Sequence, residues 1–375
     1  MDFYFDNAAT TKLSERAAKT YIKTSQDFPG NPSSIHREGL KAKEELERRR
    51  EECATILGVK PECLVFTSGA TESIGQFFSS LLWQEPGEIL FSRIEHEAVS
   101  SWMPILTQYG WKITKLKAKK GFVTVDEVKE KLSADTKVVA IMSVNNALGT
   151  IQNIRELAKA IREFESERRR KILFFSDSVQ ALGKTDLDLT GWDVDGASFS
   201  SHKINGPRGI GLLYLKNPAS FRSIAPAGGQ ERGKRGGTEN LPAIAAFTEA
   251  LKEWYEEKDK KEPKIREYNA LIRSELEAMD MKILTPEENV SPYILTIATK
   301  LPSEVFARML MDKGICVSSG SACSNNAKGK TESILEAMGI KHDDSTKAIR
   351  ISLTKDTKEE EVNELIKAFK EILHG

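Results

Sequence analysis

The sequence predicts an α/β protein in which a mainly parallel sheet lies between helices and is followed by a smaller α+β unit. The first observation is that residues 62–252 alternate short apolar runs with helical patterns, which is typical of a parallel sheet covered by helices. The second is the charged run at 258–262, which ends at Pro263 and which we interpret as a solvated break between two units. The third is that helices and strands follow in a different order from residue 264 onward.

Six apolar runs in the first part are candidate strands, at 64–66, 88–91, 137–142, 171–175, 196–199 and 211–215. Several of them have apolar residues on both faces, which indicates central strands. A helical stretch follows from about residue 242 to 257. The second part is expected to contain a helix, two strands near 281–298, a helix from Ser303, a polar loop at 318–330, a strand at 348–353 and a closing amphipathic helix.

Composition and charge exclude several classes of function. Lys+Arg and Asp+Glu both number 55, so no overall field attracts nucleic acid or an anionic membrane. The opening residues lack the regions of a secretory signal and no apolar run has the length of a membrane span, so we expect a cytoplasmic protein. The 4 cysteines show no C-x-x-C spacing, which argues against a zinc site or a disulfide framework, and we expect no metal.

Three candidate strands end in residues that carry chemistry, and ligands of open α/β sheets bind at the carboxyl ends of strands. The run that ends at Phe66 continues through Gly69 into a helix whose first N–H groups suit a phosphate, although a plain helix cap is the simpler explanation of this segment alone. Asp177 follows the run at 171–175, at a place that also suits a turn or a helix cap. Lys203 lies between an apolar strand and a glycine-rich turn, an unusual place for a lysine.

Together these three ends describe a site for pyridoxal phosphate. This cofactor needs a lysine that condenses with its aldehyde, a carboxylate that keeps its ring nitrogen charged and a cradle for its phosphate. Competing nucleotide sites fail, because Ser178 and Ser324 stand where a P-loop before the two Gly-Lys-Thr segments would need glycine. No strand leads into a G-x-G-x-x-G fingerprint either.

Many short motifs in a fixed order carry a family resemblance. They begin with Phe5 to Thr11, end with Ile349 to Ser352, and include the segments 30–36, 66–72, 95–99, 145–146, 200–203, 228–233, 235–240 and 318–323. With these motifs the chain resembles the cysteine desulfurases of the NifS/IscS branch within the fold-type I, class V pyridoxal-phosphate enzymes. The resemblance implies a mainly parallel seven-stranded sheet in a large domain at 14–257, with 1–13 and 258–375 forming the small domain.

The resemblance also implies roles around the cofactor. Lys203 would be the Schiff-base lysine, Asp177 the partner of the pyridinium nitrogen, and Gln180 the partner of the ring hydroxyl oxygen. His96 would stack on the ring and shuttle protons. Phosphate and further cofactor contacts would come from Ala70, Thr71, Asn146, Ser200 and His202, and from Thr238 of a neighbouring subunit, which implies a homodimer.

The same resemblance implies that Asn31, Asn146 and Arg350 bind the substrate, with Arg350 on its α-carboxylate. A guanidinium matches a carboxylate in two parallel hydrogen bonds. Simpler structural roles remain for several of these residues. His96 stands between two glutamates and suits an acidic surface turn, Arg350 suits an outward position on a strand, and Asn145 with Asn146 suits a turn.

The cysteines differ in their surroundings. Cys53 lies at helical spacing with apolar neighbours, and Cys63 and Cys316 border apolar strands, so all three suit a core. Cys323 lies in a polar stretch followed by Lys328 and Lys330, as a reactive thiol would. The resulting hypothesis is that L-cysteine becomes L-alanine while its sulfur moves to Cys323 as a persulfide, for an acceptor such as an iron–sulfur scaffold.

Two other classes of function stay open. One is a related lyase that acts on selenocysteine, cysteine or cystine, and the other is a non-catalytic partner in sulfur assembly. Departures from the family pattern bear on substrate preference and partner surface. They are Ala147 in place of the usual glutamate, Asp177-Ser178-Val179-Gln180 for Asp-Ala-x-Gln, Arg235-Gly236-Gly237-Thr238 for Arg-Ser-Gly-Thr, and Glu332 to Leu335 in place of Ser-His-Val-Leu.

Overall fold

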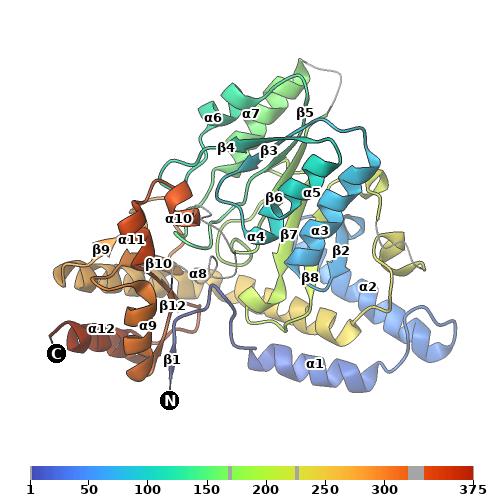
Figure 1. Ribbon diagram of the computed structural model, residues 1–375. Coiled ribbons are helices and arrows are strands. Elements are labelled where there is room, and N and C mark those ends of the chain that lie inside the picture. Colours follow the sequence, from blue (N-terminus) through green and yellow to red (C-terminus); the bar gives the residue numbers. More distant parts are fainter. Residues whose placement is uncertain (1, 168–170, 224–227, 320–332, 375) are drawn as a thin grey trace.

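The large part of the chain is built around one seven-stranded sheet (Figure 1). The computed structural model describes residues 2–167, 171–223, 228–319 and 333–374. The strands of this sheet are β2 (Leu64–Thr67), β8 (Gly211–Leu215), β7 (Gly196–Ser200), β6 (Leu173–Asp177), β5 (Thr136–Ala140), β3 (Glu88–Ser92) and β4 (Lys112–Leu116), in this spatial order. All neighbours pair in parallel except β8, which is antiparallel to both β2 and β7. The predicted mainly parallel sheet is confirmed.

Both faces of this sheet are covered by apolar side chains, as expected for central strands. Along β5, Val139 packs into one apolar cluster, whereas Val138 and Ala140 pack into another on the opposite face. This alternation follows from the two-residue period of a strand. The helices that surround the sheet are α1 (Glu15–Asp27), α2 (Arg37–Leu57), α3 (Ala70–Ser80), α4 (Glu97–Ser100), α5 (Trp102–Gln108), α6 (Val125–Lys131) and α7 (Ile154–Ser166).

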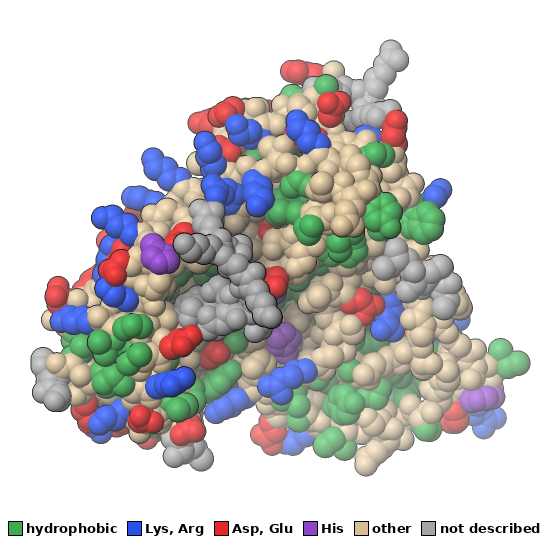
Figure 2. All heavy atoms as spheres, viewed as in Figure 1, with side chains coloured by type: hydrophobic (Ala, Val, Ile, Leu, Met, Phe, Trp, Pro, Cys, Tyr) green, Lys and Arg blue, Asp and Glu red, His purple; other side chains and the backbone are tan. Residues whose placement is uncertain are grey.

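One strand of the sheet, β4, was not predicted. It is one of the two edge strands, and Leu116 is its only buried residue, so the sequence shows no apolar run there. Lys112 and Lys115 on this strand are exposed. Figure 2 shows Lys and Arg side chains gathered over this edge of the molecule. Such charges keep an edge strand from pairing with another chain, which explains the polar composition.

The interpretation of residues 258–262 as a break is wrong. Helix α8 (Leu241–Ala278) runs through this segment with Pro263 inside it. Buried Trp254 before the segment and buried Ile265 after it keep one apolar face continuous, while Lys258 and Lys261 form ion pairs on the outside. A charged run on the solvated face of a long helix therefore looked like a linker. The division at residue 257 stays a prediction, and α8 spans it.

The C-terminal part contains a four-stranded antiparallel sheet in the order β12-β13-β10-β9. Its strands are β9 (Lys282–Ile283), β10 (Ile294–Ala298), β12 (Ser318–Ser319) and β13 (Ala348–Ser352), and the helices are α9 (Ser303–Asp312), α10 (Ile334–Ala337), α11 (His342–Thr346) and α12 (Glu359–His374). The N-terminal strand β1 (Phe3–Tyr4) pairs with β11 (Ile315–Cys316). These elements confirm the α+β prediction, and residues 1–13 reach this part of the chain through β1.

Short 3₁₀ turns connect several elements, at η1 (Pro61–Cys63), η2 (Leu81–Trp83), η3 (Ser201–Lys203), η4 (Pro218–Ser220) and η5 (Gln230–Gly233). Of these, η3 matters most for the site because it carries Lys203 directly after β7. Among the described helices, none combines the length and the apolar character that a membrane span requires.

Candidate active site

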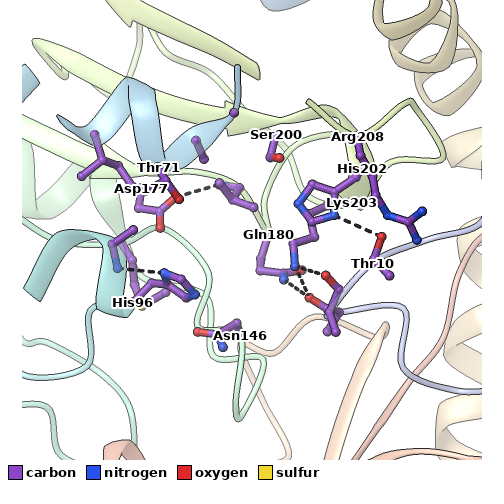
Figure 3. A pocket seen from close by; sticks show the side chains of 18 of the residues that line it. Thr10, Thr71, His96, Asn146, Asp177, Gln180, Ser200, His202, Lys203 and Arg208 are labelled. Atoms are coloured by element: carbon purple, nitrogen blue, oxygen red, sulfur yellow. Dashed lines mark hydrogen bonds between the residues drawn. The ribbon is translucent and has the colours of Figure 1, made fainter. Parts of the chain in front are cut away.

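A cavity of about 660 Å³ opens at the carboxyl ends of the parallel strands. Strand β6 ends at Asp177 and β7 ends at Ser200, and both residues line the cavity. The N-terminal segment 6–10 and Arg350 from β13 complete its wall. The predicted site residues that line this cavity are Ala70, Thr71, His96, Asn146, Asp177, Gln180, Ser200, His202, Lys203 and Arg350. Figure 3 labels all of them except Ala70 and Arg350.

The amine of Lys203 faces the N-terminal segment across the cavity. Its Nζ donates to the carbonyl oxygen of Ala8 at 2.7 Å and to that of Ala9 at 2.5 Å. The segment is fixed in turn, because Thr11 donates its backbone N–H to the carbonyl of His202 at 2.8 Å. Most lysine side chains end in solvent, whereas the amine of Lys203 ends in a cavity against two carbonyl groups. This position makes Lys203 a candidate for bonding to a ligand in the cavity.

Asp177 and His96 lie together on one side of the cavity, and Lys203 lies on the other (Figure 3). Oδ1 of the buried Asp177 accepts from Ser198 Oγ and from the backbone N–H of Val179, both at 3.1 Å. Burial raises the pKa of Asp177, while the nearby His96 and Lys203 oppose this rise. A buried carboxylate of this kind gains from a positive partner in the cavity.

The orientation of the His96 ring is set by its own backbone turn. His96 is the N-cap of α4, and its Nδ1 accepts the backbone N–H of Ala98 at 3.1 Å. Because Nδ1 is an acceptor here, the proton of the neutral ring belongs on Nε2. His96 is exposed, as expected for a residue in a surface turn, and it also lines the cavity.

The start of α3 supplies a site for an anion. Its N-cap, Gly69, has no side chain to occupy the free N–H groups of the first turn. The loop before it packs closely against β8, since a Cβ on Gly211 would lie 2.6 Å from Gly69 Cα. Thr71 and Ser200 place their hydroxyl-bearing side chains on the same cavity. The segment from Phe66 to the start of α3, which by its sequence could be a plain helix cap, thus lies at the predicted site.

His202 and Arg208 form the opposite rim of this anion site. Nδ1 of His202 lies 3.2 Å from Thr10 Oγ1. Burial and the charges of Lys203 and Arg208 lower the pKa of His202 to about 4, so the ring is neutral at pH 7 and contributes hydrogen bonds rather than charge. Arg208, which sequence reasoning missed, is exposed and lines the cavity. Its position in the glycine-rich turn after Lys203 was the available signal.

Arg350 points into the cavity rather than outward. It is 8% exposed, donates to the Asn146 carbonyl at 3.0 Å and pairs with Asp6 at 2.8 Å. Two buried polar atoms here have no partner within the described residues, Nε of Arg350 and Oδ1 of Asn146. Asn145 makes the turn, since its Oδ1 accepts two backbone N–H groups, which leaves the Asn146 side chain for the cavity.

Two predicted residues are not brought into this cavity. Asn31 and Thr238 are exposed, do not line it, and contact each other at 3.5 Å. The segment that carries Thr238 is anchored by a buried ion pair between Glu231 and Arg50, with two contacts of 2.7 Å. Cys323 lies outside the described residues.

Two buried ionisable residues beside the site were missed. Glu95 accepts from Ser92 Oγ and the backbone N–H of Met142, and its Oε2 has no partner in the described chain. Burial, together with the charge of Asp177, raises the pKa of Glu95 to about 8. Lys184 is 3% exposed and donates to Gln180 Oε1 at 3.1 Å. The sequence showed both residues, but only as the neighbour of His96 and as part of a failed P-loop.

Comparisons with known proteins show which family the chain is similar to. The model of the family "Aminotransferase class-V" matches residues 3–365. The chain is 38% identical to a NifS/IcsS protein homolog of Lactobacillus delbrueckii subsp. bulgaricus, over 98% of this chain and 96% of that protein. It is 33% identical to the putative cysteine desulfurase IscS 1 of Bacillus subtilis, over 93% of this chain and 92% of that protein.

Solved structures show the same likeness. A NifS-like protein superposes with a TM-score of 0.92 at 33% identity, over 100% of both chains. A structure described as SspA in complex with cysteine superposes with a TM-score of 0.80 at 28% identity, over 94% of this chain and 99% of that chain. With a family match along nearly its whole length and relatives of this kind, the chain belongs to the class-V aminotransferase family, in its NifS/IscS cysteine desulfurase branch.

Proposed function

We propose that the chain is a pyridoxal-phosphate-dependent cysteine desulfurase, which converts L-cysteine to L-alanine and transfers the sulfur to Cys323 as a persulfide. The observation that carries this proposal is the convergence of Lys203, Asp177 and the start of α3 on one cavity. The relatives named as cysteine desulfurases support the choice of substrate.

The residues present fit the cofactor. The cavity offers an amine at Lys203, a buried carboxylate at Asp177 that gains from a cation, and free N–H groups at the start of α3 for a phosphate. Its volume of about 660 Å³ lies in the range of small-molecule sites. When bound, pyridoxal phosphate would supply an electron sink that makes the Cα proton acidic and weakens the Cβ–S bond of the substrate.

Arg350 and Asn146 fit the α-carboxylate of an amino acid. Nε of Arg350 is a donor without a partner among the described residues, and Asn146, which lines the same cavity, can offer its carboxamide NH₂ group as a second donor. Asp6 and the Asn146 carbonyl fix the remaining guanidinium nitrogens, so the group is held in one orientation before substrate arrives. Such a site binds a planar carboxylate better than a lysine would.

The chain's own residues would move the protons and the sulfur. Lys203 takes the proton from Cα, and His96, with its proton on Nε2, exchanges protons with the substrate thiol. The thiolate of Cys323 attacks the substrate sulfur, an S–S bond forms, and the electron pair of the Cβ–S bond stays on Cβ, which takes up a proton. Cysteine and the Cys323 thiol thereby become alanine and the Cys323 persulfide, with no external oxidant.

A homodimer and a sulfur acceptor complete the proposal. Thr238 is exposed and lies outside its own cavity, so it is free to reach the phosphate bound by a second copy of the chain. The persulfide sulfur would pass to a protein acceptor, such as an iron–sulfur scaffold.

Alanine release from L-cysteine tests the proposal directly. Lys203→Ala is expected to remove all turnover, and Cys323→Ser is expected to keep the bound cofactor but lose alanine formation by about a hundredfold or more, because a serine hydroxyl cannot accept the sulfur. Cys316→Ser is the matched control, since Cys316 lies at β11 outside the cavity lining, and it should turn over at the parental rate. A Cys323→Ser protein that releases alanine as fast as the parent would instead favour the related lyase.

A further inference from the structure

Lys184 is a buried lysine whose charge has no carboxylate partner within the part of the chain that the structure describes. The residue is 3% exposed. Its Nζ donates to Gln180 Oε1 at 3.1 Å and lies 5.9 Å from the centre of the Trp254 ring. A buried ammonium held by a neutral amide and an aromatic ring is incompletely compensated, because charge burial is strongly unfavourable without a counter-charge.

A second lysine on the same ring shows how the fold compensates a buried charge elsewhere. Lys355 Nζ lies 6.0 Å from the Trp254 ring centre, and its side chain is 1% exposed. Unlike Lys184, it pairs with Glu253 at 2.7 Å and with Glu257 at 2.5 Å. The contrast indicates that the missing counter-charge of Lys184 comes from a ligand rather than from these acidic side chains.

The contact with Lys184 fixes which way the Gln180 carboxamide faces. An ammonium group only donates hydrogen bonds, so the oxygen Oε1 has to face Lys184 and the NH₂ group has to face the other way. The NH₂ group donates to the Ala8 carbonyl at 2.9 Å, the same oxygen that accepts from Lys203 Nζ at 2.7 Å. The Gln180 NH₂ group and the Lys203 amine therefore meet at the Ala8 carbonyl oxygen in the cavity wall.

We propose that Lys184 is a positioning residue, which locks the Gln180 NH₂ group towards the cavity and supplies the positive charge that favours an anionic ring oxygen of the cofactor beside Gln180. This inference rests on the proposed function and deepens it. It assigns a role to a residue that contacts neither the substrate site at Arg350 nor the amine of Lys203 through any hydrogen bond shown by the structure.

The electrostatics of the cofactor-free cavity agree with this role. Burial, together with the charges of Lys203 and Arg350, lowers the pKa of Lys184 to about 7. The lysine thus destabilises the empty protein, and a bound anion would relieve that penalty.

The test compares cofactor-free Lys184→Met with the parent protein. The variant is expected to melt at the same temperature as the parent or higher at pH 7, because an uncompensated charge is removed. Its dissociation constant for pyridoxal phosphate is expected to rise about tenfold, and the absorbance maximum of the bound cofactor is expected to shift. Lys355→Met, the matched control on the same ring, should melt lower and keep the parental dissociation constant within about twofold.

A second comparison shows whether Lys184 acts through Gln180. In a Gln180→Ala background, adding Lys184→Met should lower cofactor affinity less than it does in the parent, since no carboxamide is left to orient and only the positive charge is lost. Lys184→Gln keeps an N–H donor without charge and should fall between the parent and Lys184→Met. Parental affinity in both Lys184 variants, or an equal loss from Lys184→Met in both backgrounds, would overturn the inference alone. A parent protein that binds no pyridoxal phosphate would overturn the proposed function as well.

Discussion

Glu95 and Asp177 are two buried carboxyl groups to which the proposed function gives different charge states. In that proposal Asp177 is ionised and keeps the ring nitrogen of the cofactor charged, whereas Glu95 has an Oε2 without a partner among the described residues and a pKa raised to about 8. A neutral Glu95 avoids placing a second negative charge next to Asp177. The division of roles follows from their contacts, since Asp177 lines the cavity and Glu95 lies behind it.

Glu95→Gln tests this assignment through stability. The folded protein keeps the Glu95 proton up to about pH 8, whereas the unfolded chain loses it near pH 4.3. The folded state therefore binds more protons in between, and the parent's stability falls as pH rises through this window. The melting temperature of cofactor-free Glu95→Gln should exceed that of the parent by about 2–5 °C at pH 9, with little difference at pH 5.

Glu88→Gln is the matched control on β3. Hydrogen bonds from Ser133, Thr114 and Lys112 outweigh burial and lower the pKa of Glu88 to about 2, so its charged form stabilises the fold above the pKa of the unfolded chain. Replacing it should lower the melting temperature throughout pH 6–9. Parallel melting curves of parent and Glu95→Gln across the whole range would show that Glu95 is already ionised.

The residue scale also shows where sequence reasoning ends. Asp177 and Lys203 could be predicted because each follows an apolar strand, and the carboxyl ends of parallel strands meet at one edge. Glu95 and Lys184 could not, because their importance lies in burial and in contacts with Met142 and Gln180 that only the fold creates.

At the scale of elements, the proposed phosphate site depends on the approach of β8 to the loop before α3. The register pairs Thr67 with Gly211, and a side chain at Gly211 would collide with the backbone of Gly69. The glycine lets the α3 start sit at the cavity, so the two elements form the anion site together.

Gly211→Ala is therefore expected to weaken pyridoxal phosphate binding by about tenfold or more, because the added Cβ displaces the loop that ends at Gly69. Fluorescence titration of the cofactor-free protein measures this change. Gly75→Ala within α3 serves as the control, since its Cβ would meet Trp102 at an ordinary 3.6 Å and alanine favours a helix. Equal affinity in Gly211→Ala and the parent would contradict the account of the loop.

A strand could be predicted where its residues are buried, because a buried strand appears in the sequence as a run of apolar residues. The six predicted strands of the large sheet met that condition, including the fully buried edge strand β2, whereas the edge strand β4 has one buried residue and was missed. The sequence pattern predicts that the helix ends near residue 257, because the charged residues that follow and Pro263 resemble a linker, but α8 continues to Ala278. The helix continues through the charged segment because Trp254 and Ile265 pack into the core on either side of it. The local pattern of charged residues does not show this tertiary packing.

At the scale of the whole molecule, the N-terminal segment joins the two sheets. Residues 3–4 pair with β11, residues 8–9 accept hydrogen bonds from Lys203, and Asp6 pairs with Arg350 of β13. One stretch of chain thus sets the distance between the amine and the guanidinium. The role proposed for Thr238, which lies outside this arrangement, requires a second copy of the chain.

Mixing two variants that are each expected to weaken cofactor binding tests that role. If Thr238 serves the neighbouring subunit, refolding Lys203→Ala together with Thr238→Ala yields mixed dimers in which one site carries both changes and the other carries neither. Parental cofactor affinity should then return in a fraction of the sites, as measured by titration. If Thr238 serves its own subunit, every site keeps one change and no parental affinity returns.

The central claim is that the amine of Lys203 bonds covalently to pyridoxal phosphate. Borohydride reduction of the cofactor-loaded protein, followed by peptide mass mapping, measures this directly, because reduction makes the link permanent. The account predicts the cofactor on the peptide that contains Lys203 and none on the peptide that contains Lys184. Label on another lysine, or no label at all, would contradict it.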